Sequence, residues 1–143
     1  MLNAQYQYKL VEAGCDEVGR GCIAGPVVAA AVILPPDYKN KSIIDSKRLS
    51  HKKRKEVGQE IIDNATSWSI SEVSNNKIDE INILNASILA MHRSLDKLKV
   101  RPEFIIVDGN KFNPYKKIRH ECIIKGDNKF QNIAAASILA KNY

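Results

Sequence analysis

The sequence is poor in cysteine and in long apolar runs, and each shortage excludes a class of protein. Its 143 residues hold three cysteines and no C-x-x-C pair, so we expect reduced thiols in a cytoplasmic protein rather than a zinc framework or a disulfide scaffold. The longest apolar run, residues 27–34, is strand-sized and far below the ~18 residues of a membrane span. The first residues carry neither a basic flank nor an apolar core, so no secretory signal is expected.

Several common functional motifs are missing as well. The chain contains no P-loop, no G-x-G-x-x-G sequence and no G-x-S-x-G context around its serines, among them Ser46 and Ser137. Its three histidines share no spacing typical of metal ligands, and there are no internal repeats. Chemistry must therefore be sought in other residues.

What is present is an ordinary globular composition with a basic balance. Hydrophobic residues make up 44% and charged residues 27% of the chain, which argues against wholesale disorder. The length fits one domain over residues 1–143 that is large enough to bury a core. The net charge of +6 permits a polyanionic partner such as nucleic acid but does not require one.

Two early strands are predicted to pair as a hairpin. We expect the first strand to end just before the acidic pair Asp16-Glu17, and the apolar residues 26–34 to form a buried strand that Pro35-Pro36 ends. Between them, Gly19-Arg20-Gly21 predicts a turn, because two glycines admit positive φ angles and a close backbone approach.

The rest of the chain alternates helices with strands. Ser50 can cap a helix over 51–64, residues 68–73 alternate as a third strand, and one long helix is predicted over 78–98. The apolar stripe of that helix consists of Ile78, Ile81, Leu84, Ile88, Met91, Leu95 and Leu98.

Two strands, at 104–107 and 121–125, and a helix at 133–140 complete the prediction. We expect the last helix to be cut short at the end of the chain. The order of elements indicates an α/β fold with some parallel pairing.

Four acidic residues are expected at strand ends: Asp16, Glu17, Asp108 and Asp127. Ligands of open α/β sheets collect beyond the carboxyl ends of strands, and carboxylates that converge there repel one another unless a cation neutralises them. Oxygen ligands of this kind suit Mg²⁺ or Mn²⁺. The alternative is that these residues are ordinary turn formers and helix caps.

Basic residues and the glycine turn are the remaining candidates. Lys47 and Lys125 stand beside loops where a solvated helix face does not explain them, unlike the run Lys52–Lys55. Both are candidate phosphate contacts. The Gly19-Arg20-Gly21 turn could bring backbone N–H groups and a guanidinium to a sugar or phosphate, or could be a plain hairpin turn.

Six ordered motifs together resemble bacterial ribonuclease HII. They are G-C-D-E-V-G-R-G (14–21), A-G-P-V-V-A-A-A-V (24–32), D-S-K-R-L-S (45–50), N-I-L-N-A-S (82–87), V-D-G-N (107–110) and K-G-D with I-A-A-A-S-I-L-A-K (125–141). The resemblance implies the ribonuclease H-like fold, a central five-stranded mixed sheet flanked by helices. It also implies cleavage of the RNA strand of RNA–DNA hybrids and at single ribonucleotides in duplex DNA.

The resemblance also assigns roles to residues. Asp16, Glu17, Asp108 and Asp127 match the family's metal-binding carboxylates, which would hold two Mg²⁺ or Mn²⁺ ions and leave products with a 3′-OH and a 5′-phosphate. Gly19, Arg20 and Gly21 match the turn that senses the ribose 2′-OH, while Lys47 and Lys125 are expected to contact phosphates. We expect a monomer that binds nucleic acid and no membrane.

One departure from the family keeps an alternative open. Family members continue past A-K-x-x with an R-D pair, further helices and a tyrosine that stacks on the sugar beside the ribonucleotide, and Tyr143 does not match that tyrosine. We therefore expect a domain truncated at its C-terminus, and a hybrid-binding fragment with impaired turnover is the alternative function. The third hypothesis is a resolvase-like or integrase-like nuclease, and the Gly19-Arg20-Gly21 turn argues against it.

Overall fold

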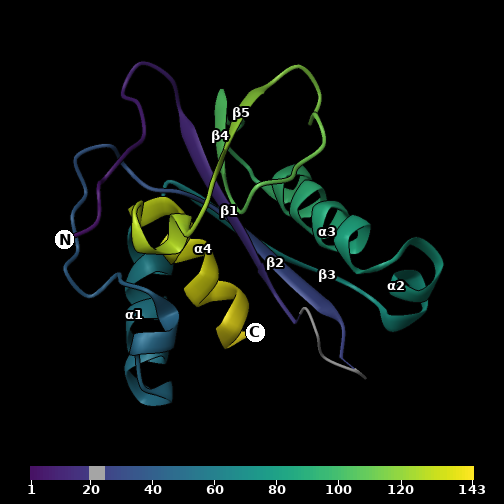
Figure 1. The fold of residues 1–143 in the computed structure, drawn as a ribbon. Coiled ribbons are helices and arrows are strands. Elements are labelled where there is room, and N and C mark those ends of the chain that lie inside the picture. Colours follow the sequence, from purple (N-terminus) through teal and green to yellow (C-terminus); the bar gives the residue numbers. More distant parts are fainter. Residues whose placement is uncertain (20–24) are drawn as a thin grey trace.

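The computed structural model describes residues 1–19 and 25–143 (Figure 1). In this part of the chain, five strands form one mixed sheet in the order β3-β2-β1-β4-β5. The strands are β1 (Glu12–Val18), β2 (Val27–Ile33), β3 (Ser67–Val73), β4 (Phe104–Asp108) and β5 (Arg119–Ile123). The first three pair antiparallel, while β1 runs parallel to β4 and β4 parallel to β5. The predicted α/β class and five-stranded mixed sheet are confirmed.

The predicted hairpin exists, but its first strand extends further than expected. β1 and β2 pair antiparallel, and the register joins Asp16 to Ala30 and Glu17 to Ala29. The acidic pair therefore lies inside β1 rather than after it, because the ladder with the apolar β2 continues to Val18. Residues 20–24 of the connecting turn lie outside the described residues.

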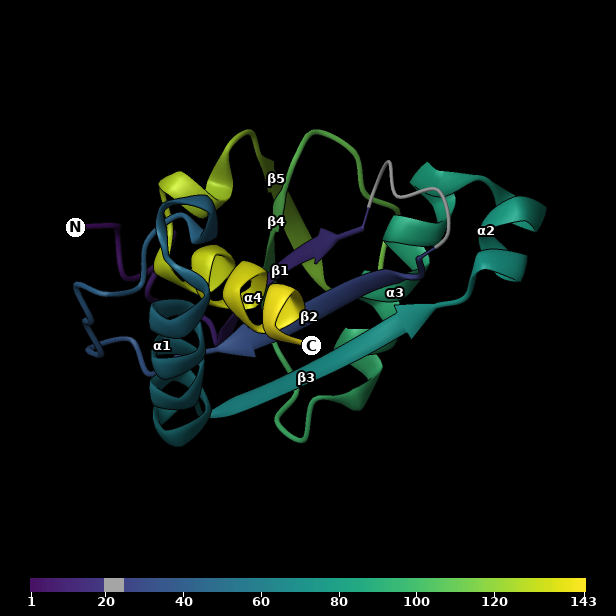
Figure 2. The same ribbon diagram turned by 90° about the horizontal axis from the view of Figure 1, so that it is seen from below.

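Helices cover both faces of the sheet (Figures 1 and 2). α2 (Asn75–Ile81) and α3 (Ile83–Lys97) lie on one face, and α1 (His51–Asn64) and α4 (Gln131–Asn142) lie on the other. α1 has the predicted bounds, and the side chain of Ser50 caps it by accepting from the backbone N–H of Lys53 at 3.1 Å. The alternation of sheet and helix layers places two large apolar cores around one sheet, with a smaller third cluster around Phe104, Ile106 and Ile133.

The predicted long helix is in fact two helices. The chain breaks at Asn82, whose φ of 71° lies outside the helical range. Asn82 ends α2 through its backbone N–H, and its side chain accepts from the N–H of Asn85 at 3.0 Å to start α3. The apolar spacing continues across the break, so periodicity alone predicted one helix.

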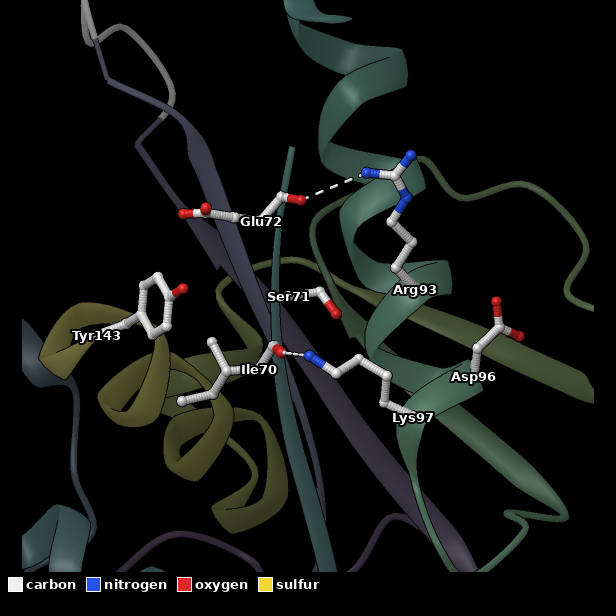
Figure 3. A pocket seen from close by; sticks show the side chains of 7 residues that line it. All are labelled: Ile70, Ser71, Glu72, Arg93, Asp96, Lys97 and Tyr143. Carbon is white, nitrogen blue, oxygen red and sulfur yellow. Dashed lines mark hydrogen bonds between the residues drawn. The ribbon is translucent and has the colours of Figure 1, made fainter. Parts of the chain in front are cut away.

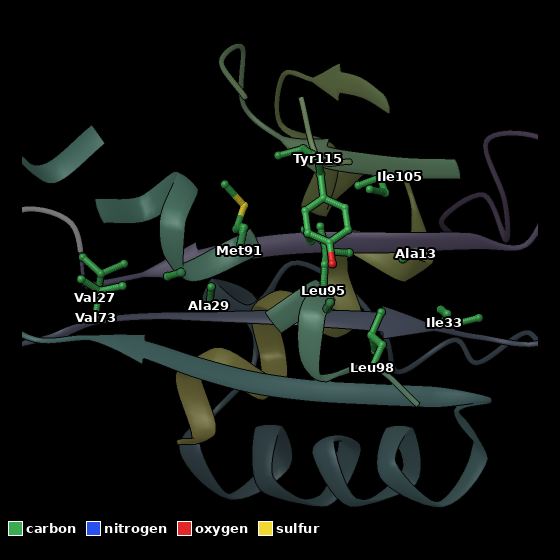
Figure 4. Packing of buried hydrophobic residues seen from close by; sticks show 14 of the residues in the cluster. Ala13, Val27, Ala29, Ile33, Val73, Met91, Leu95, Leu98, Ile105 and Tyr115 are labelled. Carbon is green, nitrogen blue, oxygen red and sulfur yellow. The ribbon is translucent and has the colours of Figure 1, made fainter. Parts of the chain in front are cut away.

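The core between the sheet and α3 contains most of the predicted stripe (Figure 4). Met91 and Leu95 pack there against Ala29, Ile105 and other strand residues. Ile78 and Ile81 of α2 are only partly buried at the margin of this cluster. Small residues of α3, among them Ala86 and Ala90, are fully buried and let the helix lie close to the sheet.

The fifth strand begins and ends two residues earlier than predicted. β5 is an edge strand, so its side chains are exposed or half-buried rather than core residues. After Ile123 the chain turns away: Ile124 is 61% exposed and Lys125 adopts a left-handed conformation with φ 54°. This turn leads into the short 3-10 helix η2 (Gly126–Asn128).

The opposite edge strand, β3, is covered by basic side chains (Figure 3). Arg93 and Lys97 of α3 donate to the backbone carbonyls of Glu72 and Ile70. They line a cavity of about 410 Å³ together with the carboxylates of Glu72 and Asp96. Cations of α3 that occupy the carbonyl groups of an edge strand block its pairing with another chain, so we interpret this cavity as edge protection rather than a site.

Two of the three cysteines lie in the described residues. Cys15 is buried in the core, Cys122 is half-buried and Cys22 lies outside the described residues. No helix in the described ranges is long and apolar enough to cross a membrane.

Candidate active site

Four carboxylates line one cavity of about 170 Å³ at the end of the central strands. They are Asp16, Glu17, Asp108 and Asp127, the four that the sequence singled out. The same cavity is lined by Val18, Ser46, Lys47, Ser137 and Lys141. Residues separated by up to 125 positions in the sequence therefore meet at one place.

The parallel pairing of β1 with β4 brings the first acidic residues together. Cys15 pairs with Val107, so Asp16 and Asp108 follow at the same level of the two strands. Asp16 is only 4% exposed, and one of its carboxylate oxygens accepts from the N–H of Glu17 at 2.8 Å. Glu17 is half-buried and lines the same cavity.

Backbone donors hold Asp108 in place. Its Oδ1 accepts from the N–H of Gly126 at 2.7 Å and from the N–H of Asp127 at 3.4 Å. Gly126 is buried, and a Cβ at this position would lie 2.5 Å from the Ile133 side chain and 3.4 Å from Asp108 Oδ1. Asp127 lies in the first turn of η2, so it also fits the alternative explanation that these acidic residues are turn formers and helix caps.

α4 packs closely on β1 next to the site. A Cβ at Gly14 would lie 2.4 Å from the backbone carbonyl carbon of Asn132 and 2.6 Å from the nitrogen of Ile133. Only glycine lets the helix approach this closely two residues before Asp16.

The carboxylates disfavour one another's charge. Burial raises the pKa of Asp16 well above its ordinary value, and the negative charges of Asp108, Glu17 and Asp127 raise it further. Burial also raises the pKa of Asp127, with contributions from Asp108 and Asp45, while Lys47 opposes the shift. A cation in this cavity would relieve both effects.

The donor set fits a hard divalent cation in its chemistry. All four side chains offer carboxylate oxygens, the ligands that Mg²⁺ and Mn²⁺ prefer. As placed, no three histidine, cysteine, aspartate or glutamate side chains of residues 1–19 and 25–143 form a closed ligand group. The shared cavity and the repulsion among its carboxylates nevertheless favour a cation site, because carboxylates that repel one another separate unless a cation draws them together.

The predicted basic residues differ in position. Lys47 lines the cavity from the 3-10 helix η1 (Ser46–Arg48), and Asp45 caps this helix by accepting from the Lys47 N–H at 3.0 Å. Lys125 is exposed at the start of η2 and is not among the cavity-lining residues. The structure does not bring Lys125 to the carboxylates.

The predicted glycine turn is only partly described. Gly19 follows β1 with φ 98°, and a Cβ there would lie 2.5 Å from the carbonyl oxygen of Pro26. Arg20 and Gly21 lie outside the described residues. The observed positive φ agrees with the expected need for glycine.

Three polar residues of the cavity, Ser46, Ser137 and Lys141, are not predicted from the sequence. The two serines lack the motif of a nucleophile, so the sequence does not single them out. A usable signal did exist, since Ser137 and Lys141 are four residues apart and share a helix face.

Comparison with known proteins gives a consistent family. The family model described as Ribonuclease HII matches residues 13–143. Proteins named Ribonuclease HII from Christiangramia forsetii and Bacteroides thetaiotaomicron are 60% and 58% identical to this chain over 143 residues. Each match covers all of this chain and 72% of the relative.

Solved structures of ribonucleases superimpose on this chain. The ribonuclease H2 of Pyrococcus horikoshii OT3 superimposes with a TM-score of 0.79 at 25% identity, covering 91% of this chain and 70% of that protein. Bst-RNase HIII in complex with Mn²⁺ superimposes with a TM-score of 0.77 at 25% identity, covering 92% of this chain and 50% of that one.

Proposed function

This chain belongs to the ribonuclease HII family, an endoribonuclease family, and from that premise we propose how its site works. We propose that it hydrolyses the RNA strand of RNA–DNA hybrids and cuts at single ribonucleotides embedded in duplex DNA. The observation that carries the proposal is the cavity in which four carboxylates from two strands, β1 and β4, and the 3-10 helix η2 meet.

The four carboxylates would hold two divalent cations, Mg²⁺ or Mn²⁺. When bound, such ions activate water and stabilise charge at phosphorus during an in-line displacement, which leaves a 3′-OH and a 5′-phosphate. Asp16 is buried and accepts from the N–H of Glu17, and Asp108 accepts from two backbone N–H groups, so these two residues would set the position of the site. The Mn²⁺ complex of a solved relative supports the choice of metal.

Recognition of the substrate is assigned to two further groups. Gly19, Arg20 and Gly21 would read the ribose 2′-OH, the group that distinguishes RNA from DNA. Lys47 lies beside the carboxylates and would contact a phosphate near the scissile bond. Lys125, exposed and outside the cavity, would contact the backbone further away.

Asp16→Asn tests the proposal. The change keeps the side-chain volume and removes a charged oxygen ligand, so we expect cleavage of a duplex with one embedded ribonucleotide to fall below detection. The assay is gel separation of end-labelled products in Mg²⁺ and in Mn²⁺. Asp79→Asn, an exposed aspartate on α2, is the matched control and should cleave like the parent.

Each other outcome has a clear meaning. Metal-dependent cleavage by Asp16→Asn at the parent rate would refute the assigned site. Cleavage of an all-DNA duplex as fast as the ribonucleotide substrate would favour a general metal nuclease. Tight hybrid binding without cleavage by the parent chain would favour the hybrid-binding alternative.

A further inference from the structure

The carboxylate cavity contains a second cation that the sequence did not assign. Lys141, in the last turn of α4, lines this cavity together with Lys47. The two lysines differ in freedom: the Lys47 side chain is 71% exposed and lies 3.8 Å from Asp45, whereas Lys141 is half-buried. In the part of the chain that the structure describes, no ion pair engages Lys141.

A buried pair of hydroxyl groups joins the two lysine-bearing elements. Ser46 Oγ and Ser137 Oγ lie 3.1 Å apart and hydrogen-bond, and the two residues are 1% and 2% exposed. Ser46 directly precedes Lys47 in η1, and Ser137 lies one helical turn before Lys141 on the same face of α4. This bond therefore fixes the distance between the two lysine-bearing backbones.

The charges at the cavity indicate what Lys47 and Lys141 can do. The four carboxylates carry four negative charges when ionised, and two divalent cations would cancel them and leave none to offset a phosphodiester. A phosphodiester brings one negative charge, and attack at phosphorus adds another. Lys47 and Lys141 supply two positive charges at the same cavity, which is the surplus that such a substrate needs.

We infer that Lys141 is a phosphate-binding residue and that Lys47, Lys141 and the Ser46–Ser137 bond form a two-lysine clamp for a nucleic-acid backbone. This inference rests on the proposed function for the nature of the polyanion. A purely structural explanation exists, because a lysine in the last turn of a helix also interacts favourably with the helix dipole. The two explanations differ in what salt does to binding.

The test measures binding in the absence of cleavage. A fluorescent duplex with one ribonucleotide is titrated in EDTA at several salt concentrations, and the logarithm of affinity is plotted against that of salt. Each neutralised phosphate contributes about 0.9 to this slope, so Lys141→Gln should lower the slope by about 0.9 and weaken binding about eight-fold at ~0.1 M salt. Lys141→Arg should restore both.

Lys77→Gln is the matched control. Lys77 lies on α2, pairs with Glu80 at 3.4 Å and is not among the residues that line the cavity, so its loss should leave the slope unchanged. Ser137→Ala keeps every charge but removes the link, so it should weaken binding with a slope close to that of the parent.

The outcomes separate the clamp from the function. If Lys141→Gln lowers the melting temperature but binds with the parent slope and affinity, the clamp is refuted and the helix-dipole role stands. If the parent binds the duplex but never cleaves it in Mg²⁺ or Mn²⁺, the proposed function fails while the slope still decides the role of Lys141.

Discussion

At the scale of single residues, Gly14 shows how one missing side chain permits the site. The residue lies on β1 where α4 crosses it, and its neighbours along the helix are backbone atoms of Asn132 and Ile133. Backbone atoms cannot rotate away as a flexible side chain can. The position of Asp16 over α4 therefore depends on a residue that carries no chemistry itself.

We predict that Gly14→Ala destabilises the fold by about 1–3 kcal/mol or more, because the new methyl group overlaps the α4 backbone. Urea unfolding followed by circular dichroism measures the loss. Gly58→Ala is the control: its Cβ meets mainly the amide end of Asn142, and alanine favours the α1 helix. Equal losses in the two variants would contradict this explanation.

Glu12 is a second residue whose importance is structural. It is 2% exposed, and its carboxylate accepts from the N–H groups of Tyr6 and Gln7 and from the side chain of Asn132. It thereby ties the N-terminal segment to α4. Burial nevertheless raises the pKa of Glu12, and these hydrogen bonds only partly oppose the effect.

The raised pKa of Glu12 predicts a pH dependence of stability. The folded chain holds this proton to a higher pH than the unfolded chain, so the Glu12 contribution to stability falls as pH rises from about 4.5 through the folded pKa. Glu12→Gln removes the ionisable group, so the variant does not lose this contribution to stability as pH rises. We expect the melting temperature of the variant, relative to the parent, to be lowest at acidic pH and to rise toward neutral pH; a constant difference would contradict the prediction.

At the scale of elements, the break between α2 and α3 matters most. Asn82 ends one helix and starts the next at a φ of 71° and a ψ of 170°, a backbone conformation that residues other than glycine rarely adopt. The break lets α2 leave the sheet while α3 stays on it (Figure 4 shows α3 residues in the core).

Two substitutions at Asn82 separate cap from conformation. Asn82→Ala loses the cap on Asn85 and forces alanine to a positive φ, so we expect a loss of about 2–3 kcal/mol. Asn82→Gly loses the cap but tolerates the φ, so its loss should be about 1 kcal/mol or less. Chemical unfolding of both variants measures the difference, and an alanine variant as stable as the glycine variant would show that the φ costs nothing.

The elements also show what the sequence could and could not predict. Residue patterns located the five strands of the described residues as well as α1, α3 and α4, and Ser50 marked the start of α1 to the residue. Apolar spacing predicted α2 and α3 as one helix, because the break at Asn82 leaves the spacing of the apolar residues intact. The apolar residues around Ile124 placed the predicted strand two residues later than β5. β5 is an edge strand, which does not need to be apolar, and Ile124 lies outside it.

The site was predictable to the same extent. Acidic residues near strand ends pointed to Asp16, Glu17, Asp108 and Asp127, since topology brings such residues together. Ser46, Ser137 and Lys141 do not follow strands, so this rule could not find them. The four-residue spacing predicts only that Ser137 and Lys141 share a helix face, while the contact of Ser137 with Ser46 joins residues 91 positions apart and leaves no local pattern.

At the scale of the whole molecule, the net charge of +6 conceals an uneven distribution. The carboxylates concentrate negative charge in one cavity, and a cation bound there would link the metal to the stability of the entire fold. We predict that Mn²⁺ raises the melting temperature, by the equivalent of about 1.4 kcal/mol at ten times the dissociation constant. Differential scanning fluorimetry measures it without any substrate.

Asp16→Asn should abolish most of this shift, and Asp79→Asn should keep it. A shift of the same size in all three proteins would mean that Mn²⁺ binds elsewhere. Calcium, added in place of manganese, is a useful comparison because it offers the same charge to oxygen ligands with a different preferred geometry.

The parallel pairing of β1 with β4 has a consequence for folding. Asp16 lies near one end of the chain, and Asp108 and Asp127 lie near the other, so the cavity requires closure of a loop of about ninety residues. Contacts of such long range form late and slowly. During refolding, recovery of metal affinity should therefore lag behind recovery of helical signal, and the metal site would report completion of the fold.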